Sequence, residues 1–294
     1  MGKFYDAIEK AQKNKQVTSN IESKNLYSSL NDDELQECLF KPQEKLSKEH
    51  NNFIDIDKRL VTIDNSSSFE AEQIRILKTN ILNPRNGKIP RSILVTSAVP
   101  YEGKSFIAAN LAITLAQSID QYSLLVDCDL RMPTVHHLFG YRTVPGLSDC
   151  LNKKECISNL LLKTNVQKLS ILPAGNIGRN PSELLSSKDM VRLISEVTER
   201  YNDRFVILDS PPPSLASETK SISSNVDGII LVVKLGSTRR ELVLELIETL
   251  GREKIIGIVV NWFDMRSLLS FLYGKYSKYE RYYRKYRTKS RGGN

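Results

Sequence analysis

The sequence predicts an α/β protein in which a parallel β-sheet is flanked by helices on both faces. Two observations lead to this fold class. Six short runs rich in valine, isoleucine and leucine recur along the chain, and helical patterns separate most of them. Strands that are buried on both faces read as near-continuous apolar runs, and their alternation with helices is typical of parallel sheets.

The elements follow from these patterns in chain order. The expected strands are the apolar runs at 92–97, 123–128, 169–174, 204–209, 228–234 and 255–261. The expected helices lie at 104–118, 182–201 and 238–251. One more helix is expected from Phe69, because Ile74, Leu77 and Ile81 recur at helical spacing and serines precede them as candidate caps.

The two ends of the chain lack this alternation. Residues 1–66 are polar, apart from a short amphipathic helix that is expected near the start, and they read as a flexible segment and linker. Residues 67–266 carry the α/β pattern and are expected to form one domain. Residues 267–294 are expected to form a flexible, basic, tyrosine-rich tail.

The net charge of +8 and the isoelectric point near 9.2 raise the question of a nucleic-acid partner. From Tyr273 onward, eight lysines or arginines stand against one acid, Glu280, so the tail carries +7 and the rest of the chain only +1. Because the body of the protein is nearly neutral, we expect no nucleic-acid partner for it.

Other sequence features bear on the location of the protein. No apolar run reaches the roughly 18–20 residues of a membrane span, and the start matches neither a secretory signal nor a myristoylation pattern. A cytoplasmic protein is therefore expected. The four cysteines form no CxxC pair or zinc spacing, so reduced thiols are expected, and the adjacent His136 and His137 do not suggest a metal site.

Residues 98–105 read A-x-x-x-x-G-K-S between an expected strand and an expected helix, which is the context that a phosphate-binding P-loop requires. Backbone N–H groups at such a helix start surround phosphates. Lys104 is expected to reach the β- and γ-phosphates, and the Ser105 hydroxyl to bind Mg²⁺. The expected nucleotide contacts in this stretch are Ala98, Val99, Pro100, Tyr101, Glu102, Gly103, Lys104, Ser105 and Phe106.

Acidic residues end two further strands of this P-loop NTPase-type sheet. Asp127 and Asp129 end the stretch 124–129, and their spacing makes both project the same way at the edge where the P-loop lies. Asp209 ends the stretch 205–209, which reads as a Walker B strand whose acid holds Mg²⁺ through water. Three acids beside one P-loop predict a site for a magnesium nucleotide.

Half of the 12 tyrosines lie close together near the C-terminus, separated by lysines and arginines. They are Tyr273, Tyr276, Tyr279, Tyr282, Tyr283 and Tyr286. A polar, basic tail offers these rings nothing to pack against, so burial in a core does not explain why they are there. Four of them follow 3-4-3 spacing, so a helix that packs on another surface also remains open.

Taken together, these stretches resemble the bacterial tyrosine kinases of capsule and exopolysaccharide synthesis, of the stand-alone cytoplasmic type. The resemblance covers about 69–286. It is carried by EQIRILKTN, TSAVPYEGKS, LLVDCDLRMPTVHHLFG, GLSDCL, LPAGNIGRNPSELLSS, VILDSPP and the tyrosine cluster. In the family's terms, 98–105 is Walker A, 124–129 is Walker A′ and 205–209 is Walker B.

The resemblance implies autophosphorylation of the tyrosine cluster, in trans between subunits, with ATP as donor and Mg²⁺ as cofactor. This reaction would regulate the synthesis and export of a polysaccharide. The implied catalytic residues are Lys104, Asp127, Asp129 and Asp209. Asp127 would be the base that helps to deprotonate the tyrosine, whereas Asp129 and Asp209 would organise Mg²⁺ together with Ser105.

The resemblance also implies partners. A separate transmembrane chain-length regulator would activate the kinase and bring it indirectly to the inner face of the membrane, and a phosphotyrosine phosphatase would reverse the modification. The family's oligomer helix reads E-x-x-R-x-x-R, and the matching residues here are Glu72, Arg75 and Lys78. Because lysine cannot reproduce a bidentate arginine contact, a homo-oligomeric ring is expected in weakened form.

Two other functions remain open from the sequence. A P-loop ATPase switch in polysaccharide chain-length control needs nearly the same groups, although it has no use for exposed tyrosines, and related partitioning ATPases carry a lysine where this chain has Val99. A tail that anchors to nucleic acid or to an anionic membrane would use cations and stackable rings. At the residue level, Asn261 is either an adenine contact, by analogy with related P-loop folds, or a turn-forming residue.

Overall fold

The computed structural model describes residues 56–84, 87–153, 155–176, 180–199, 203–213 and 218–262. Within these ranges, seven strands form one sheet in the order β3-β4-β2-β5-β1-β6-β7. The strands are β1 (Ser92–Ser97), β2 (Tyr122–Asp127), β3 (Leu162–Lys163), β4 (Leu169–Leu172), β5 (Arg204–Asp209), β6 (Gly228–Lys234) and β7 (Ile255–Asn261). All neighbours are parallel except the pair β3 and β4.

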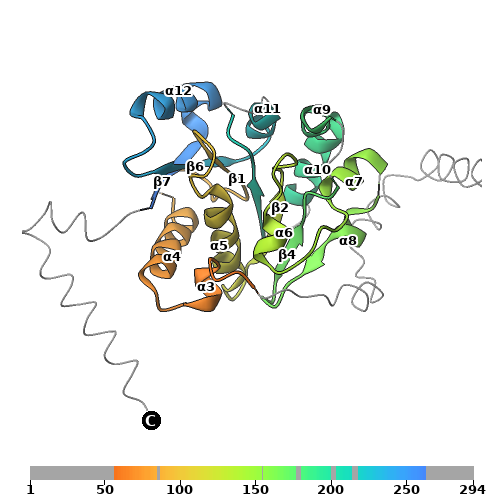
Figure 1. Cartoon of the computed structure of the whole chain (residues 1–294), viewed down its shortest axis with the longest axis horizontal. Coiled ribbons are helices and arrows are strands. Elements are labelled where there is room, and N and C mark those ends of the chain that lie inside the picture. Colours follow the sequence, from red (N-terminus) through yellow and green to blue (C-terminus); the bar gives the residue numbers. More distant parts are fainter. Residues whose placement is uncertain are drawn as a thin grey trace, which may run out of the picture.

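The helices of the described residues connect these strands and cover both faces of the sheet (Figure 1). They are α3 (Val61–Asp64), α4 (Phe69–Leu82), α5 (Lys104–Ala116), α6 (Val135–Leu138), α7 (Leu147–Lys153), α8 (Ile157–Leu160), α9 (Pro181–Leu185), α10 (Lys188–Glu199), α11 (Glu218–Ser224) and α12 (Arg240–Leu250). A 3-10 turn, η2 (Arg252–Lys254), precedes β7. The predicted α/β fold class is confirmed.

The core consists of two layers, one on each face of the sheet. Successive strand residues alternate between them, so that Leu94 belongs to one apolar cluster and its neighbours Ile93 and Val95 belong to the other. Helices α4 and α5 cover one face, and α7 to α12 cover the other. Burial on both faces explains why these strands read as near-continuous apolar runs.

Besides small shifts in the ends of several elements, the structure differs from the expectation in two places. The single helix expected at 182–201 is divided into α9 and α10, because the Ser187 hydroxyl accepts the N–H of Met190 (3.2 Å) and caps the start of a second helix. The strand β3 was not expected, since its two residues are too few to form a pattern.

The folded domain begins earlier in the chain than the expected end of the linker at residue 66. Leu60 is fully buried in the core, and Val61–Asp64 forms α3. The amide of Asn110 in α5 holds this stretch, because its oxygen accepts the N–H of Thr62 (3.1 Å) and its nitrogen donates to the carbonyl of Arg59 (3.0 Å). Residues 56–66 therefore belong to the folded unit. The expected helix near the start and the tail at 267–294 lie outside the described residues.

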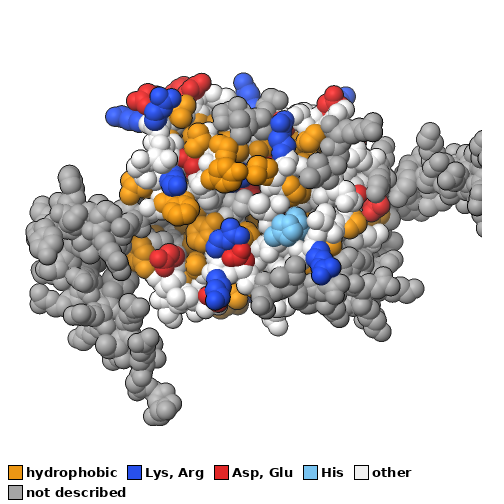
Figure 2. Space-filling view, in the orientation of Figure 1, with side chains coloured by type: hydrophobic (Ala, Val, Ile, Leu, Met, Phe, Trp, Pro, Cys, Tyr) orange, Lys and Arg blue, Asp and Glu red, His pale blue; other side chains and the backbone are white. Residues whose placement is uncertain are grey.

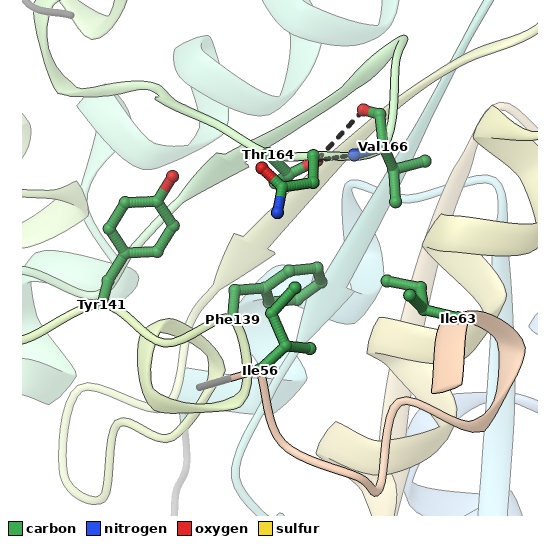
Figure 3. Close-up of a pocket in the computed structure, with 7 residues that line it drawn as sticks. Ile56, Ile63, Phe139, Tyr141, Thr164 and Val166 are labelled. Carbon is green, nitrogen blue, oxygen red and sulfur yellow. Dashed lines mark hydrogen bonds between the residues drawn. The ribbon is translucent and has the colours of Figure 1, made fainter. Parts of the chain in front are cut away.

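A small apolar cavity of about 10 Å³ lies between this early stretch and the β3–β4 turn (Figure 3). Ile56 and Ile63 face Phe139 and the turn, in which the Thr164 hydroxyl donates to the carbonyl of Val166 (3.0 Å). Its lining residues are Ile56, Ile63, Phe139, Tyr141, Thr164, Asn165 and Val166. Because the turn precedes β4, the cavity lies at the amino edge of the parallel strands, away from the P-loop, and has room for about one water molecule.

The surface of the described part carries both signs of charge. Figure 2 shows lysine and arginine side chains interspersed with acidic ones on the visible face, with several exposed hydrophobic side chains between them. No helix in the described ranges has the length and apolar character needed to cross a bilayer.

Candidate active site

The P-loop joins β1 to α5 at the carboxyl edge of the sheet. Two of its residues have left-handed backbone conformations, Tyr101 with φ of 65° and Gly103 with φ of 93°. A Cβ atom at Gly103 would lie 2.1 Å from the side-chain nitrogen of Asn261. Glycine is therefore required at this position both by its backbone and by the close approach of β7.

Glu102 gives the loop its shape from inside the protein. Its carboxylate is buried and accepts the N–H of Val99 (2.9 Å), the N–H of Lys234 (3.3 Å) and the hydroxyl of Thr238. These bonds tie the loop to the end of β6. The predicted nucleotide contact at this residue can therefore come only from its backbone, since the side chain is fully used within the protein.

Lys104 is the first residue of α5, and its ammonium group lies 2.9 Å from the Asp129 carboxylate. Burial lowers the pKa of Lys104, but Asp209, Asp129 and Asp127 together raise it above its usual value. Lys104 therefore stays charged, and it is positioned among the three acids that the sequence singled out.

Strand register brings Asp127 and Asp209 together. They are directly paired residues at the carboxyl ends of the adjacent strands β2 and β5. Asp127 is fully buried and accepts the backbone N–H groups of Asp129 (3.1 Å), Thr134 (3.2 Å) and Val135 (3.1 Å). Burial and the charge of Asp209 raise the pKa of Asp127 well above its usual value, although the N–H contacts oppose this shift.

Asp209 is the least satisfied polar group of the site. It is fully buried, and neither carboxylate oxygen makes a hydrogen bond of normal geometry. The pKa of Asp209 is raised to about 6, because the effect of burial exceeds the opposing effects of the Lys104 charge and the nearby Ser105 hydroxyl. Buried polar groups are almost always paired, so an unpaired carboxylate indicates a missing positive partner.

This arrangement fits Mg²⁺. Three carboxylates face one lysine, so two negative charges remain uncompensated when all of them are ionised. No group of three acidic, histidine or cysteine side chains in the described ranges forms a complete metal cage. Mg²⁺ needs no such cage, because it binds through one or two carboxylates together with water and substrate phosphates.

The carboxyl end of β7 closes the other side of the loop. The Asn261 side chain donates to the carbonyl of Glu102 (2.8 Å), so it holds the P-loop directly. The next residue, Trp262, is 62 % exposed, and the ammonium group of Lys234 lies 4.6 Å from its ring centre. Sequence reasoning missed Trp262, although it is the only tryptophan and follows a singled-out residue.

Arg131 is a second residue that the motifs did not reveal. Its guanidinium group pairs with Glu218 of α11 (3.0 Å) and donates to the hydroxyl of Ser182 in α9 (2.8 Å). Glu218 is fully buried, and its other carboxylate oxygen has no partner. Arg131 therefore connects the loop that follows Asp129 to the helices α9 and α11.

The remaining candidates lie elsewhere. Glu72 and Arg75 pair with each other on α4 (2.5 Å), and the Lys78 ammonium donates to the hydroxyl of Ser118 (3.3 Å). This helix lies on the outer face of α5 and not at the P-loop (Figure 1). The six tail tyrosines are outside the described residues, so their role as phosphoacceptors stays a prediction.

Comparisons with known proteins identify similar chains. The chain is 35% identical over 208 residues to tyrosine-protein kinase YwqD of Bacillus subtilis, covering 70% of this chain and 86% of that protein. It is 34% identical to tyrosine-protein kinase ptk of Acinetobacter johnsonii over 209 residues, which are 71% of this chain and 28% of that longer protein.

Among solved structures, the kinase domain of the Escherichia coli tyrosine kinase ETK aligns with a TM-score of 0.64 and 26% identity. The alignment covers 76% of this chain and 87% of that domain. No protein-family model matches the chain.

Proposed function

We propose, because this chain belongs to the bacterial tyrosine kinase family, that it transfers the γ-phosphoryl group of ATP to tyrosine hydroxyls. The acceptors would be the tyrosines at 273–286 of a neighbouring copy. The observation that carries the proposal is the buried, unpaired carboxylate of Asp209, which lies opposite Asp127 with Lys104 nearby. With these residues, Asp209 could bind the magnesium ion of a nucleotide while Asp127, next to it, accepts a proton.

The P-loop and α5 would bind the phosphates. Backbone N–H groups of 98–106 would surround them, and Lys104 would leave Asp129 to contact the β- and γ-phosphates. Ser105, Asp129 and Asp209 would hold Mg²⁺, directly or through water. When bound, Mg²⁺ neutralises charge on the phosphates. Asp129, which pairs with Lys104 in the structure, would then be free to help hold the metal.

Asp127 would accept the proton of the attacking tyrosine. A phenol has a pKa of about 10, so a nearby base assists its attack. The raised pKa of Asp127 makes it a stronger proton acceptor than an ordinary aspartate, and its three N–H contacts fix its orientation. The phenol oxygen forms the new bond to phosphorus, the bond to ADP breaks, and the phenol proton goes to Asp127.

The tail would be a self-limiting substrate. Each phosphotyrosine adds roughly −1.5 to −2 charges at neutral pH, so six of them would add about −9 to −12 to a tail of +7. The unmodified tail would be attracted to the acidic site of a neighbour, and the modified tail would be repelled. If a tail with glutamate at all six positions gave the same oligomer mass as the native tail, this part of the proposal would be wrong.

The family also supports a cellular setting. We infer a cytoplasmic kinase that a transmembrane chain-length regulator brings to the membrane, that assembles into a ring through α4, and that a phosphatase resets. In this setting it would regulate the synthesis and export of a capsular or extracellular polysaccharide. Coexpression with candidate regulators, followed by membrane fractionation, tests this setting independently of the chemistry.

Mass spectrometry of the purified protein after incubation with Mg-ATP tests the reaction. We expect phosphate on tyrosines within 273–286 and none in Lys104→Met. Asp127→Asn should retain nucleotide binding and lose most of the transfer, which separates the base from the nucleotide site. ATP hydrolysis without tyrosine phosphate, even with a membrane regulator present, would instead identify an ATPase switch.

A further inference from the structure

An open aromatic side chain borders the P-loop on the side that faces away from the acids. Asp127 and Asp209 end β2 and β5, whereas β6 and β7 lie on the other side of β1, from which the P-loop starts (Figure 1). Trp262 follows directly after β7, and its side chain is largely exposed. Its indole nitrogen lies 4.0 Å from the position that a Cβ atom on Gly103 would have, so the ring is next to the loop itself.

The order of the strands gives a bound nucleotide a direction. Lys104 and the acids would hold the β- and γ-phosphates and Mg²⁺ on the side of β5 and β2. The phosphates would lie over the start of α5, so an extended nucleotide places its nucleoside on the opposite side, over β6 and β7. The exposed ring of Trp262 lies on this side of the loop.

Packing does not account for this tryptophan. Neither of the two apolar clusters of the described residues includes Trp262. Its φ of 59° is rare for a bulky residue, and backbone strain of this kind clusters at ligand-binding sites. An exposed aromatic side chain on a strained backbone therefore points to a ligand and not to the core.

Lys234 fixes the orientation of the ring. Its ammonium group lies 4.6 Å from the ring centre, which is a cation–π contact. Its backbone N–H donates to Glu102 (3.3 Å) and to the hydroxyl of Thr238 (2.9 Å), so the end of β6 is itself held in place. Because the lysine covers one face of the indole, a flat ligand would stack on the other face.

We propose that Trp262, oriented by Lys234, is the surface on which the base of the bound nucleotide stacks. Stacking on an aromatic side chain raises affinity by roughly 5- to 150-fold. It does so without reading the base, because every base has a π-face. The base lies away from the reacting phosphate, so the contact should strengthen binding and leave the rate of transfer unchanged. The stacking rests on the nucleotide site of the proposed kinase, but it does not depend on which tyrosine is the acceptor.

Tryptophan fluorescence of the full chain reports the contact directly, because Trp262 is the only tryptophan. We expect Mg-ADP to change the emission in a saturable manner. Inorganic triphosphate with Mg²⁺ occupies the phosphate positions but has no base, so it should leave the emission nearly unchanged. Equal changes with both ligands would overturn the proposal, as would no change at an ADP concentration that calorimetry shows to be saturating.

Calorimetry on variants separates stacking from damage to the P-loop. Trp262→Ala should weaken Mg-ADP binding about tenfold and leave the binding of inorganic triphosphate unchanged, whereas Trp262→Phe should keep the ADP affinity within about threefold of the native value. The proposal is overturned if Trp262→Ala binds ADP with native affinity. Equal losses for ADP and triphosphate would also overturn it, because they would show that the substitution only deforms the loop.

Tyr122→Ala is the matched control. Tyr122 is another aromatic residue that is partly exposed and has a cation beside it, since the guanidinium of Arg204 lies 5.9 Å from its ring centre. It is the first residue of β2 and therefore lies at the amino edge of the sheet, opposite the P-loop. Its substitution should leave the affinity for Mg-ADP unchanged, and a loss as large as that of Trp262→Ala would overturn the proposal.

Transfer kinetics distinguish this proposal from the kinase function. If the chain phosphorylates tyrosine, Trp262→Ala should raise KM for ATP about tenfold and leave kcat unchanged. A lower kcat with an unchanged KM would contradict a stacking role. An absence of tyrosine phosphate, together with base-dependent binding, would contradict the kinase and leave the stacking standing, so the two failures are distinguishable.

Discussion

Replacing Asp209 with asparagine should change how the stability of the protein depends on pH. Asp209 is fully buried, neither of its carboxylate oxygens makes a hydrogen bond of normal geometry, and its pKa is raised to about 6. An aspartate in an unfolded chain titrates near 3.9. The folded protein therefore binds a proton at this residue more tightly than the unfolded chain does.

The sign of the effect follows from this difference. The stabilising contribution of the protonated carboxyl is fully present below pH 4, and it is lost as the pH rises through 6. A shift of about 2 pH units corresponds to roughly 3 kcal/mol, since each unit is about 1.36 kcal/mol. Asparagine cannot ionise, so Asp209→Asn should not lose this amount between pH 4 and pH 7.5.

Urea unfolding in the absence of metal and nucleotide, at a series of pH values, measures this effect. The native protein should lose roughly 3 kcal/mol more than Asp209→Asn over that range, with most of the loss between pH 4 and pH 6. Mg-nucleotide should flatten the native curve, because a cation beside the carboxylate favours its charged form. If the two proteins had parallel pH dependences without metal, the burial of Asp209 would not raise its pKa as the structure implies.

Three further substitutions give independent checks. Gly103→Ala should lower the affinity for a fluorescent nucleotide about tenfold or more, because the new Cβ collides with Asn261 of β7. Gly87→Ala is the control: Gly87 also has a positive φ, but no atom lies within 4 Å of its Cβ position, so nucleotide binding should not change. Arg131→Met should cost about 2 kcal/mol in urea unfolding, because it leaves Glu218 buried and unpaired, and a second change to Glu218→Gln should recover part of that loss. Leu60→Ala should cost about 2–4 kcal/mol, because this side chain is fully buried, and a loss under 0.5 kcal/mol would show that the stretch before α4 is a linker after all.

The sequence was most informative where burial is uniform. All six predicted strands are present, since the inner strands are covered on both faces and need an apolar residue at almost every position, and the edge strand β7 carries the same kind of apolar run. It was least informative at short or capped elements. The two residues of β3 carry no pattern, and the break between α9 and α10 depends on one hydroxyl, that of Ser187, in a stretch that otherwise reads as one helix.

The local chemistry of the site could be predicted because it depends on residues close together in the chain. The spacing of 98–105 requires a turn between a strand and a helix, and the acids at strand ends belong to the same edge of any parallel sheet. Trp262 and Arg131 could not be predicted in this way. Their contacts, with Lys234 and with Glu218, come from segments that meet only after folding.

The sequence by itself therefore determined the fold class, the P-loop and the identity of the three acids, because hydrophobic periodicity and motif spacing are properties of neighbouring residues. Only the tertiary structure determined how deeply those acids are buried and which of them lie side by side. The register of β2 against β5 places Asp127 directly beside Asp209, and burial on both faces raises the pKa values of both. Burial and register are set by the packing of distant strands, so the different surroundings of Asp127 and Asp209 cannot be read from the sequence before the chain is folded.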